Sequence, residues 1–263
     1  MPATHLRLDR PAPGVALLTL DNPDQRNAMS DAMTASWVAA VAELKADREV
    51  RAVVVTGEGS AFCSGGNTSW IASEPDASVD HLRTRMLAFY RAWLSIKELE
   101  VPTIAALNGA AIGAGLCVAL ACDLRYAAST ARMGVPFVRL GMHAGMAGTW
   151  LLPNVVGPAR ARDLLLTGRV VDADEALRIG LVNGVSDPDA LLDDALATAG
   201  QIAATAPIAS RLTTLALRDG GHRDLESCLQ WEAMAQPITL ATADLQEGIR
   251  ASQEKRAPVF EGR

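Results

Sequence analysis

Short apolar runs alternate with longer amphipathic stretches over the first two thirds of the chain. The apolar runs are bounded by turn residues, as buried strands are, and we expect strands over 15–20, 51–55, 103–107 and 123–128. One intervening stretch, capped by Asn27 or Ser30, has Met33 and Trp37 on a single helical face, and a long amphipathic helix is expected around 81–99. This alternation predicts an α/β fold with parallel strands.

The pattern changes after Asp187-Pro188, where strand-like runs disappear. We expect helices over 189–206, 207–218, 223–235 and 238–255. An all-helical segment next to an α/β body is typical of a packing or oligomerisation region. The sequence therefore predicts a body over 1–188 and a C-terminal helical region over 189–263.

The composition fits a globular protein with a sizeable core, since 49% of the 263 residues are hydrophobic and 21% are charged. The net charge is −6 and the basic residues are scattered, which argues against a nucleic-acid partner. His5 and Arg7 interrupt any signal peptide, and Pro102 and Asn108 break the most apolar segment, 101–121. We expect no membrane association.

The four cysteines, Cys63, Cys117, Cys122 and Cys228, show neither a CxxC pattern nor a Cys/His spacing. No metal site is therefore expected. Free thiols are typical of a reducing compartment, and we expect a cytoplasmic location.

Two glycine-bearing stretches follow predicted strands, 61–67 (AFCSGGN) and 108–115 (NGAAIGAG). Glycine lets backbone N–H groups approach a ligand closely. If the two loops converge, two amides would point at one oxygen atom and form an oxyanion hole. The simpler alternative is a pair of tight turns.

The second stretch also matches the glycine spacing of the phosphate loop in short-chain dehydrogenases. It lies in the middle of the chain, however, and neither Tyr90 nor Tyr126 is followed four residues later by Lys. A nicotinamide cofactor is therefore not expected.

The order of the motifs is similar to that of the crotonase (enoyl-CoA hydratase/isomerase) superfamily, from about Val15 to the C-terminus. The matching stretches are 24–29 (DQRNAM), 59–67 (GSAFCSGGN), 108–127 (NGAAIGAGLCVALACDLRYA), 140–153 (LGMHAGMAGTWLLP), and 166–168 with 173–182 (ADEALRIGLV). One such motif would be weak evidence, but a collinear set is specific.

The resemblance implies a spiral of ββα turns with a C-terminal helical region that builds homotrimers or homohexamers. It implies an acyl-CoA thioester as ligand, with no cofactor beyond the CoA of that substrate. By position, the two oxyanion-hole amides would be those of Gly66 and Ala114.

The sequence also departs from the family pattern at two catalytic positions. The two glutamates that hydratases of the family use as acid and base fall here on Cys117 and Phe137. Phenylalanine transfers no proton, and a neutral buried thiol is a poor base. Both side chains are expected to line the acyl pocket, whereas the neighbouring Asp123 is interpreted as structural.

His143 is the candidate proton-transfer residue, because an imidazole titrates near neutrality and the segment 140–145 borders the acyl site in relatives. The alternative is a hydrogen-bonded loop histidine outside the pocket. Three acids after the first glycine loop could also reach the site: Glu74, Asp76 and Asp80.

Further residues are assigned to substrate binding from their positions in the family motifs. Arg26 and Ala28 match the loop that receives the adenine and phosphates, and Lys255 matches a lysine that meets a phosphate; an ordinary exposed cation is the alternative for Lys255. The complete predicted binding set is Arg26, Ala28, Ser64, Gly66, Trp70, Cys117, Phe137, Gly145 and Lys255.

The sequence therefore predicts an oligomeric, metal-free enzyme that acts on an acyl-CoA thioester through an enolate, as a hydratase or isomerase. The alternative is a non-catalytic acyl-CoA-binding protein that kept the oxyanion hole and lost the acid/base pair. The orientation of His143 is the feature that divides the two hypotheses.

Overall fold

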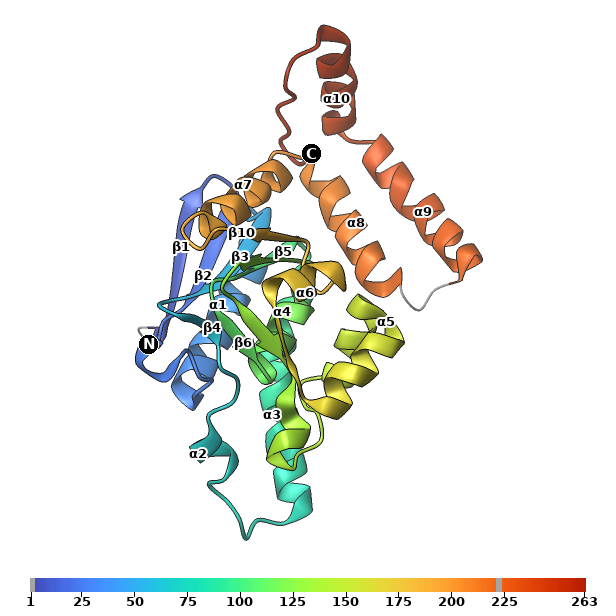
Figure 1. The fold of residues 1–263 in the computed structure, drawn as a ribbon. Coiled ribbons are helices and arrows are strands. Elements are labelled where there is room, and N and C mark those ends of the chain that lie inside the picture. Colours follow the sequence, from blue (N-terminus) through green and yellow to red (C-terminus); the bar gives the residue numbers. More distant parts are fainter. Residues whose placement is uncertain (1–2, 221–223) are drawn as a thin grey trace.

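A six-stranded sheet runs through the centre of the molecule, in the strand order β1-β2-β3-β5-β7-β10 (Figure 1). The computed structural model describes residues 3–220 and 224–263. The strands are β1 (Leu6–Ala12), β2 (Val15–Leu20), β3 (Ala52–Gly57), β5 (Thr103–Leu107), β7 (Leu124–Ala128) and β10 (Gly184–Ser186). β1 and β2 form an antiparallel pair, and the strands from β2 to β10 are parallel. The predicted α/β class with parallel strands is confirmed.

A second sheet of short strands lies beside the first, in the order β4-β6-β8-β9. Its members are β4 (Ala61–Cys63), β6 (Ala110–Ile112), β8 (Arg132–Gly134) and β9 (Val170–Asp172). Strands of three residues leave no periodic signal, and β4 and β6 lie inside the stretches that the sequence analysis assigned to glycine loops. β4 pairs with β6 in parallel, so that both glycine stretches end at the same edge of this sheet.

Helices cover the two sheets. Those of the body are α1 (Asp31–Ala46), α2 (Thr68–Ile71), α3 (Val79–Leu94), α4 (Ala114–Ala121), α5 (Gly148–Thr167) and α6 (Ala173–Arg178), with short 3-10 turns η1 (Pro23–Gln25), η2 (Ser95–Glu98) and η3 (Pro136–Leu140). The Ser30 hydroxyl accepts a hydrogen bond from the Met33 amide and caps α1, as predicted. Trp37 of α1 stacks on Trp93 of α3, with ring centroids 4.9 Å apart, and this contact joins the two helices.

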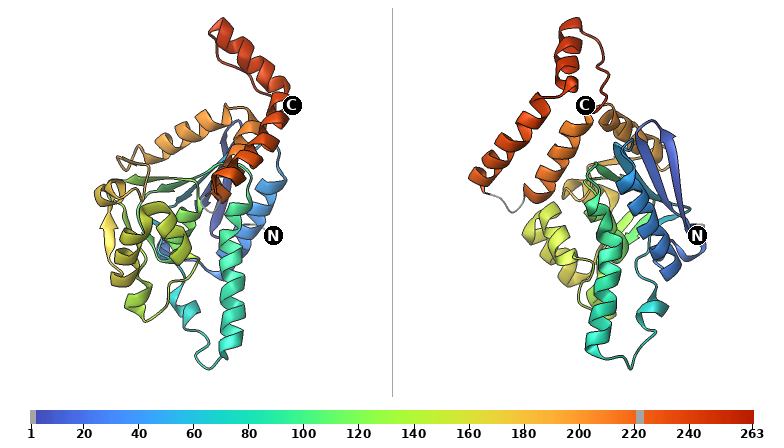
Figure 2. Two further views of the ribbon diagram at one scale, coloured as in Figure 1. Left: turned by 90° about the vertical axis from the view of Figure 1, so that its right-hand side faces the viewer. Right: turned by 180° about the vertical axis from the view of Figure 1, so that it is seen from behind.

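The C-terminal region is helical, as expected, and consists of α7 (Leu191–Ala203), α8 (Pro207–Gly220), α9 (Leu225–Leu240) and α10 (Ala243–Glu254). α7 packs on the main sheet, because Leu191, Ala195 and Ala199 on one face are buried in the core. α9 and α10 stand apart from the sheets (Figures 1 and 2). The division at residue 188 stays a prediction, whereas by packing alone the separate part begins at α9.

Asp123 anchors α8 to the body. Its carboxylate accepts hydrogen bonds from Arg218 of α8 (2.7 Å) and from the Thr103 amide (2.7 Å). Burial opposes ionisation, but the hydrogen bonds and charge of Arg218 keep the pKa of Asp123 below its usual value. The structural interpretation of Asp123 is confirmed. Across the described ranges, no helix is long and apolar enough to cross a membrane.

Candidate active site

The two glycine stretches touch each other at the ends of β4 and β6. Gly65 has a φ of +96°, and a Cβ at this position would lie 2.7 Å from the Ile112 carbonyl oxygen and 3.4 Å from the Ala114 nitrogen. A side chain at 65 would therefore strain the turn and push the two loops apart. The convergence expected from the sequence is present in the backbone.

The hydrogen bonding of the Gly66 and Ala114 amides decides whether a ligand can use them. Gly66 forms an isolated parallel bridge with Met29, in which the Met29 amide donates to Gly65 (2.9 Å) and the Asn67 amide donates to Met29 (3.3 Å). The amide of Gly66 itself takes no part in this bridge. Ala114 is the first residue of α4, whose amide has no acceptor within the helix. In the part of the chain that the structure describes, neither amide donates a backbone hydrogen bond.

α4 adds its N-terminal end to the same point. Gly115 lets the helix begin directly against β4, since a Cβ at this position would lie 2.2 Å from the Cys63 carbonyl oxygen. Every residue of α4 is buried, so that water screens the helix dipole little at its positive end. Two amides and a helix N-terminus can together stabilise a negative oxygen atom.

Hydrogen bonds hold a loop over 22–29 against the first glycine stretch. The Asn27 side chain is fully buried and donates to the carbonyl oxygens of Ala61 (2.7 Å) and Glu58 (3.0 Å). The Ser64 amide donates to the Arg26 carbonyl oxygen (3.0 Å). These bonds bring Arg26, Ala28, Ser64 and Gly66 together. The sequence analysis considered Asn27 only as a helix cap and missed its bracing role.

Cys117 lies one helical turn after Ala114 and is fully buried. Its thiol donates weakly to the Gly145 carbonyl oxygen (3.8 Å), and burial raises the pKa of Cys117 to about 12. The Phe137 ring lies 3.7 Å from the point that a Cβ on Gly113 would occupy. Cys117, Phe137 and Gly145 thus gather around the start of α4, and none carries a charge at neutral pH.

The sequence analysis did not assign Tyr90, a titratable residue, to this site. Tyr90 of α3 is half-buried, and its hydroxyl lies 2.5 Å from the point that a Cβ on Gly145 would occupy. Helical periodicity places Tyr90 on α3, but nothing in the sequence indicates that α3 crosses near residue 145.

His143 is exposed on the loop between η3 and α5, and its Nδ1 lies 2.7 Å from the Ala144 carbonyl oxygen. This is the geometry expected of a loop histidine held by its own backbone. Glu74 lies between α2 and α3, where its carboxylate contacts His81 (2.6 Å) and Arg85 (3.6 Å). The Glu74 carboxylate therefore already has two side-chain partners in its own segment. Asp76 and Asp80 are exposed in the same segment.

Two predicted binding residues are not placed beside the loops. Lys255 is exposed at the C-terminal end of α10, which projects from the opposite end of the molecule to α2 (Figures 1 and 2). The side chain of Trp70 lies outside the described part of the structure. Among the described residues, no group of three or more His, Cys, Asp or Glu side chains could hold a metal ion.

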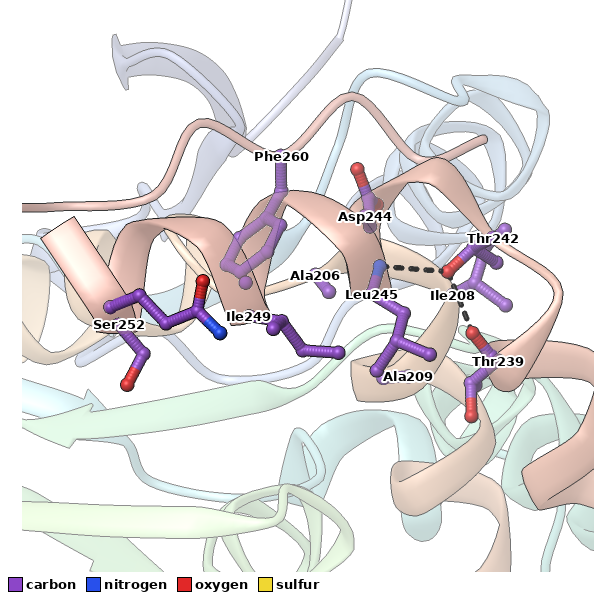
Figure 3. Close-up of a pocket in the computed structure, with 12 residues that line it drawn as sticks. Ala206, Ile208, Ala209, Thr239, Thr242, Asp244, Leu245, Ile249, Ser252 and Phe260 are labelled. Carbon is purple, nitrogen blue, oxygen red and sulfur yellow. Dashed lines mark hydrogen bonds between the residues drawn. The ribbon is translucent and has the colours of Figure 1, made fainter.

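A hollow of about 580 Å³ lies elsewhere, between α8, α10 and the C-terminal tail (Figure 3). Ile249, Leu245 and Phe260 give it an apolar lining. The carboxylate in its wall, Asp244, accepts from the amides of Glu261 (2.8 Å) and Gly262 (2.9 Å) and fixes the tail. This carboxylate is therefore already used for structure, and the hollow is separate from the glycine loops.

Comparison with known proteins points to one family. The family model described as "Enoyl-CoA hydratase/isomerase" matches residues 10–263. The crotonyl-CoA hydratase of Syntrophomonas wolfei is 37% identical over 247 residues, which cover 94% of each chain. The (E)-benzylidenesuccinyl-CoA hydratase of Thauera aromatica is 36% identical over 249 residues, covering 94% of this chain and 96% of that protein.

Solved structures give the same result. The crystal structure of an enoyl-CoA hydratase from Bacillus anthracis superposes with a TM-score of 0.93 at 32% identity, covering 99% of this chain and all of the other (100%). The fold, including the C-terminal helices, is thus that of the superfamily indicated by the sequence motifs.

Proposed function

The chain belongs to the enoyl-CoA hydratase/isomerase family, and from this premise we propose that it holds the carbonyl oxygen of an acyl-CoA thioester between the amides of Gly66 and Ala114. The observation that carries the proposal is the contact between the two glycine stretches at the N-terminus of α4, where neither amide donates a backbone hydrogen bond among the described residues. Negative charge grows on this oxygen when the thioester becomes an enolate. By analogy with measured oxyanion holes, each donor would stabilise the transition state by about 3–4 kcal/mol.

The CoA portion would lie along the loop of Arg26 and Ala28, which is fastened to Ser64 beside the first amide. Arg26 would meet a phosphate there. A contribution from Lys255 would have to come from a neighbouring copy, because α10 of the same chain points away. No cofactor beyond the CoA of the substrate is invoked, and the free cysteines support a cytoplasmic location.

The reaction that we propose is proton transfer at an enolate, such as migration of a double bond, rather than hydration. Hydration needs an acid and a base at one water molecule, and the neutral Cys117 and the apolar Phe137 supply neither. His143 is the candidate shuttle on its loop. Its present exposure means that its loop would have to turn inward when a ligand binds.

A second candidate function is acyl-CoA binding without catalysis. It is favoured by the exposure of His143 and by the absence of charge on Cys117, Phe137 and Gly145. Both functions require the same amide pair and differ only in turnover.

We also propose that α8–α10 assemble the chain into a homotrimer or homohexamer. Large apolar side chains on these helices are exposed in the single chain: Leu217, Leu225, Leu229, Met234, Ile238, Leu240 and Ile249. A surface of this kind is unfavourable in water unless it is covered. Sedimentation at low protein concentration is expected to give a trimer or hexamer, and a stable monomer would contradict the proposal.

Calorimetry tests the proposed ligand. A panel of acyl-CoA thioesters is titrated into the protein, with free CoA as the control for binding through the nucleotide alone. We expect the thioesters to bind more tightly than free CoA, since only they place an oxygen between the amides. If no thioester binds, the proposed function is wrong.

A further inference from the structure

Tyr90 enters the candidate site from α3. Its ring packs on the core and makes an edge contact with Phe89 at a centroid distance of 6.3 Å. A Cβ at position 145 would lie 2.5 Å from the Tyr90 hydroxyl and 3.0 Å from its ring carbon Cζ. The glycine at 145 therefore leaves the space that the phenol occupies.

The hydroxyl faces the region just beyond the second amide. Gly145, which it touches, contacts the thiol of Cys117 through its carbonyl oxygen. Cys117 lies three residues after Ala114 on α4, a spacing that separates side chains by about 5–6 Å. If the thioester carbonyl lies at Ala114, the Tyr90 hydroxyl is within reach of the first carbons of the acyl chain rather than its far end.

None of the hydrogen bonds found among the described residues involves the Tyr90 hydroxyl. The hydroxyl is also not fully buried. In the described ranges, the side-chain atoms that are both fully buried and unpaired are Asn22 Nδ2 and Trp37 Nε1, and the Tyr90 hydroxyl is not among them. Burial and the nearby Cys117 raise the pKa of Tyr90, which keeps the phenol protonated at neutral pH. Tyr90 thus offers a free O–H donor in a largely apolar setting.

The neighbouring groups are apolar or already hydrogen-bonded. Phe137 has no polar atom in its side chain, and the Gly145 carbonyl already accepts the Cys117 thiol. The phenol oxygen can both donate and accept a hydrogen bond, whereas an alkyl carbon can do neither. A ligand carbonyl oxygen needs only the donor.

We propose that the Tyr90 hydroxyl donates a hydrogen bond to a second carbonyl group on the acyl chain, so that the site selects 3-oxoacyl-CoA thioesters over plain alkyl ones. This inference rests on the proposed function, which places the first carbonyl between Gly66 and Ala114. An alkyl chain leaves the half-buried hydroxyl unpaired, whereas a 3-oxo group satisfies it.

The test compares the affinities of 3-oxobutanoyl-CoA and butanoyl-CoA by calorimetry, in the unaltered protein and in two variants. Tyr90→Phe removes the hydroxyl and keeps the ring. Tyr126→Phe is the matched control, because Tyr126 is the other tyrosine and contacts Thr198 of α7. We expect 3-oxobutanoyl-CoA to bind about tenfold more tightly to the unaltered protein, the net effect of one hydrogen bond.

The ratio should fall to about one in Tyr90→Phe and stay unchanged in Tyr126→Phe. A ratio near one in the unaltered protein, or one that Tyr90→Phe leaves unchanged, would overturn the proposal. If neither thioester binds, the proposed function itself fails, and that outcome is distinct from equal binding of both.

Discussion

The amide loops, 61–67 and 108–115, and the side-chain wall formed by Cys117, Phe137 and Tyr90 meet at the start of α4 but are built differently. The loops act through backbone N–H groups, and their geometry depends on glycines whose Cβ positions are filled by neighbouring backbone atoms. The wall acts through side chains packed on ordinary helices and turns. The identity of its side chains is therefore free to change without moving the amides.

Under the proposed function, this difference explains how a chain keeps the family's fold when the positions that match the hydratase acids carry other residues. Ala114 stands where glycine is frequent in the family, yet the donor is a backbone amide and survives the change. By the sequence resemblance, Cys117 and Phe137 stand where hydratases carry their two glutamates, and a different side chain there removes a proton-transfer group. The proposed function therefore combines retained acyl-CoA binding with a changed reaction.

The largest expected effect concerns the unaltered protein. Hydration of but-2-enoyl-CoA should be slower than in family hydratases by many orders of magnitude, because each positioned proton-transfer group contributes about 10²–10⁴-fold. Loss of the enoyl absorbance measures the rate, with the Syntrophomonas wolfei hydratase as positive control. Rapid hydration would mean that another acid, such as Glu74 or Asp80, fills the vacant role.

The second prediction separates the shuttle hypothesis from binding without catalysis. If the protein isomerises an enoyl-CoA, His143→Ala should lower the rate by about 10²–10⁴-fold and leave the affinity unchanged. His81→Ala is the control, since His81 is also exposed but is paired with Glu74. Isomerisation that survives His143→Ala would remove this residue from the mechanism.

The third prediction probes the loops through one methyl group. Gly115→Ala places a Cβ against the Cys63 carbonyl oxygen and should reduce the free energy of unfolding by about 1–3 kcal/mol, together with the affinity for acyl-CoA. Gly200→Ala in α7 meets no atom within 4 Å and should stabilise the protein by about 0.5–1 kcal/mol. Urea unfolding and calorimetry measure both quantities. Equal stabilities of the two variants would show that the loops are not tightly packed.

The wall supplies a prediction that depends on pH. Burial raises the pKa of Cys117 from 9.0 to about 12, so between these values the unfolded chain loses a proton that the folded chain keeps. Stability should therefore fall as the pH rises through this range, and Cys117→Ala should make the fall shallower by one proton. Denaturant titrations from pH 9 upward test this, and identical slopes would show that Cys117 is already ionised or open to water.

Much of the amide loops could be predicted from the sequence, because glycines at fixed spacing after apolar runs leave a local signal. The short strands β4 and β6 left none, and yet their parallel pairing brings the loops together. Tyr90 and Gly145 could not be paired by any pattern, since they lie on separate elements joined only by tertiary packing. The bracing role of Asn27 was missed for the same reason, because its partners Glu58 and Ala61 are distant in sequence.

The convergence of the Gly66 and Ala114 amides on one ligand oxygen is the central claim, and a crystal structure with a bound acyl-CoA tests it most directly. The account predicts that the thioester carbonyl oxygen lies about 2.7–3.1 Å from both amide nitrogens. A thioester whose carbonyl oxygen lies beyond hydrogen-bond distance of either amide would contradict it.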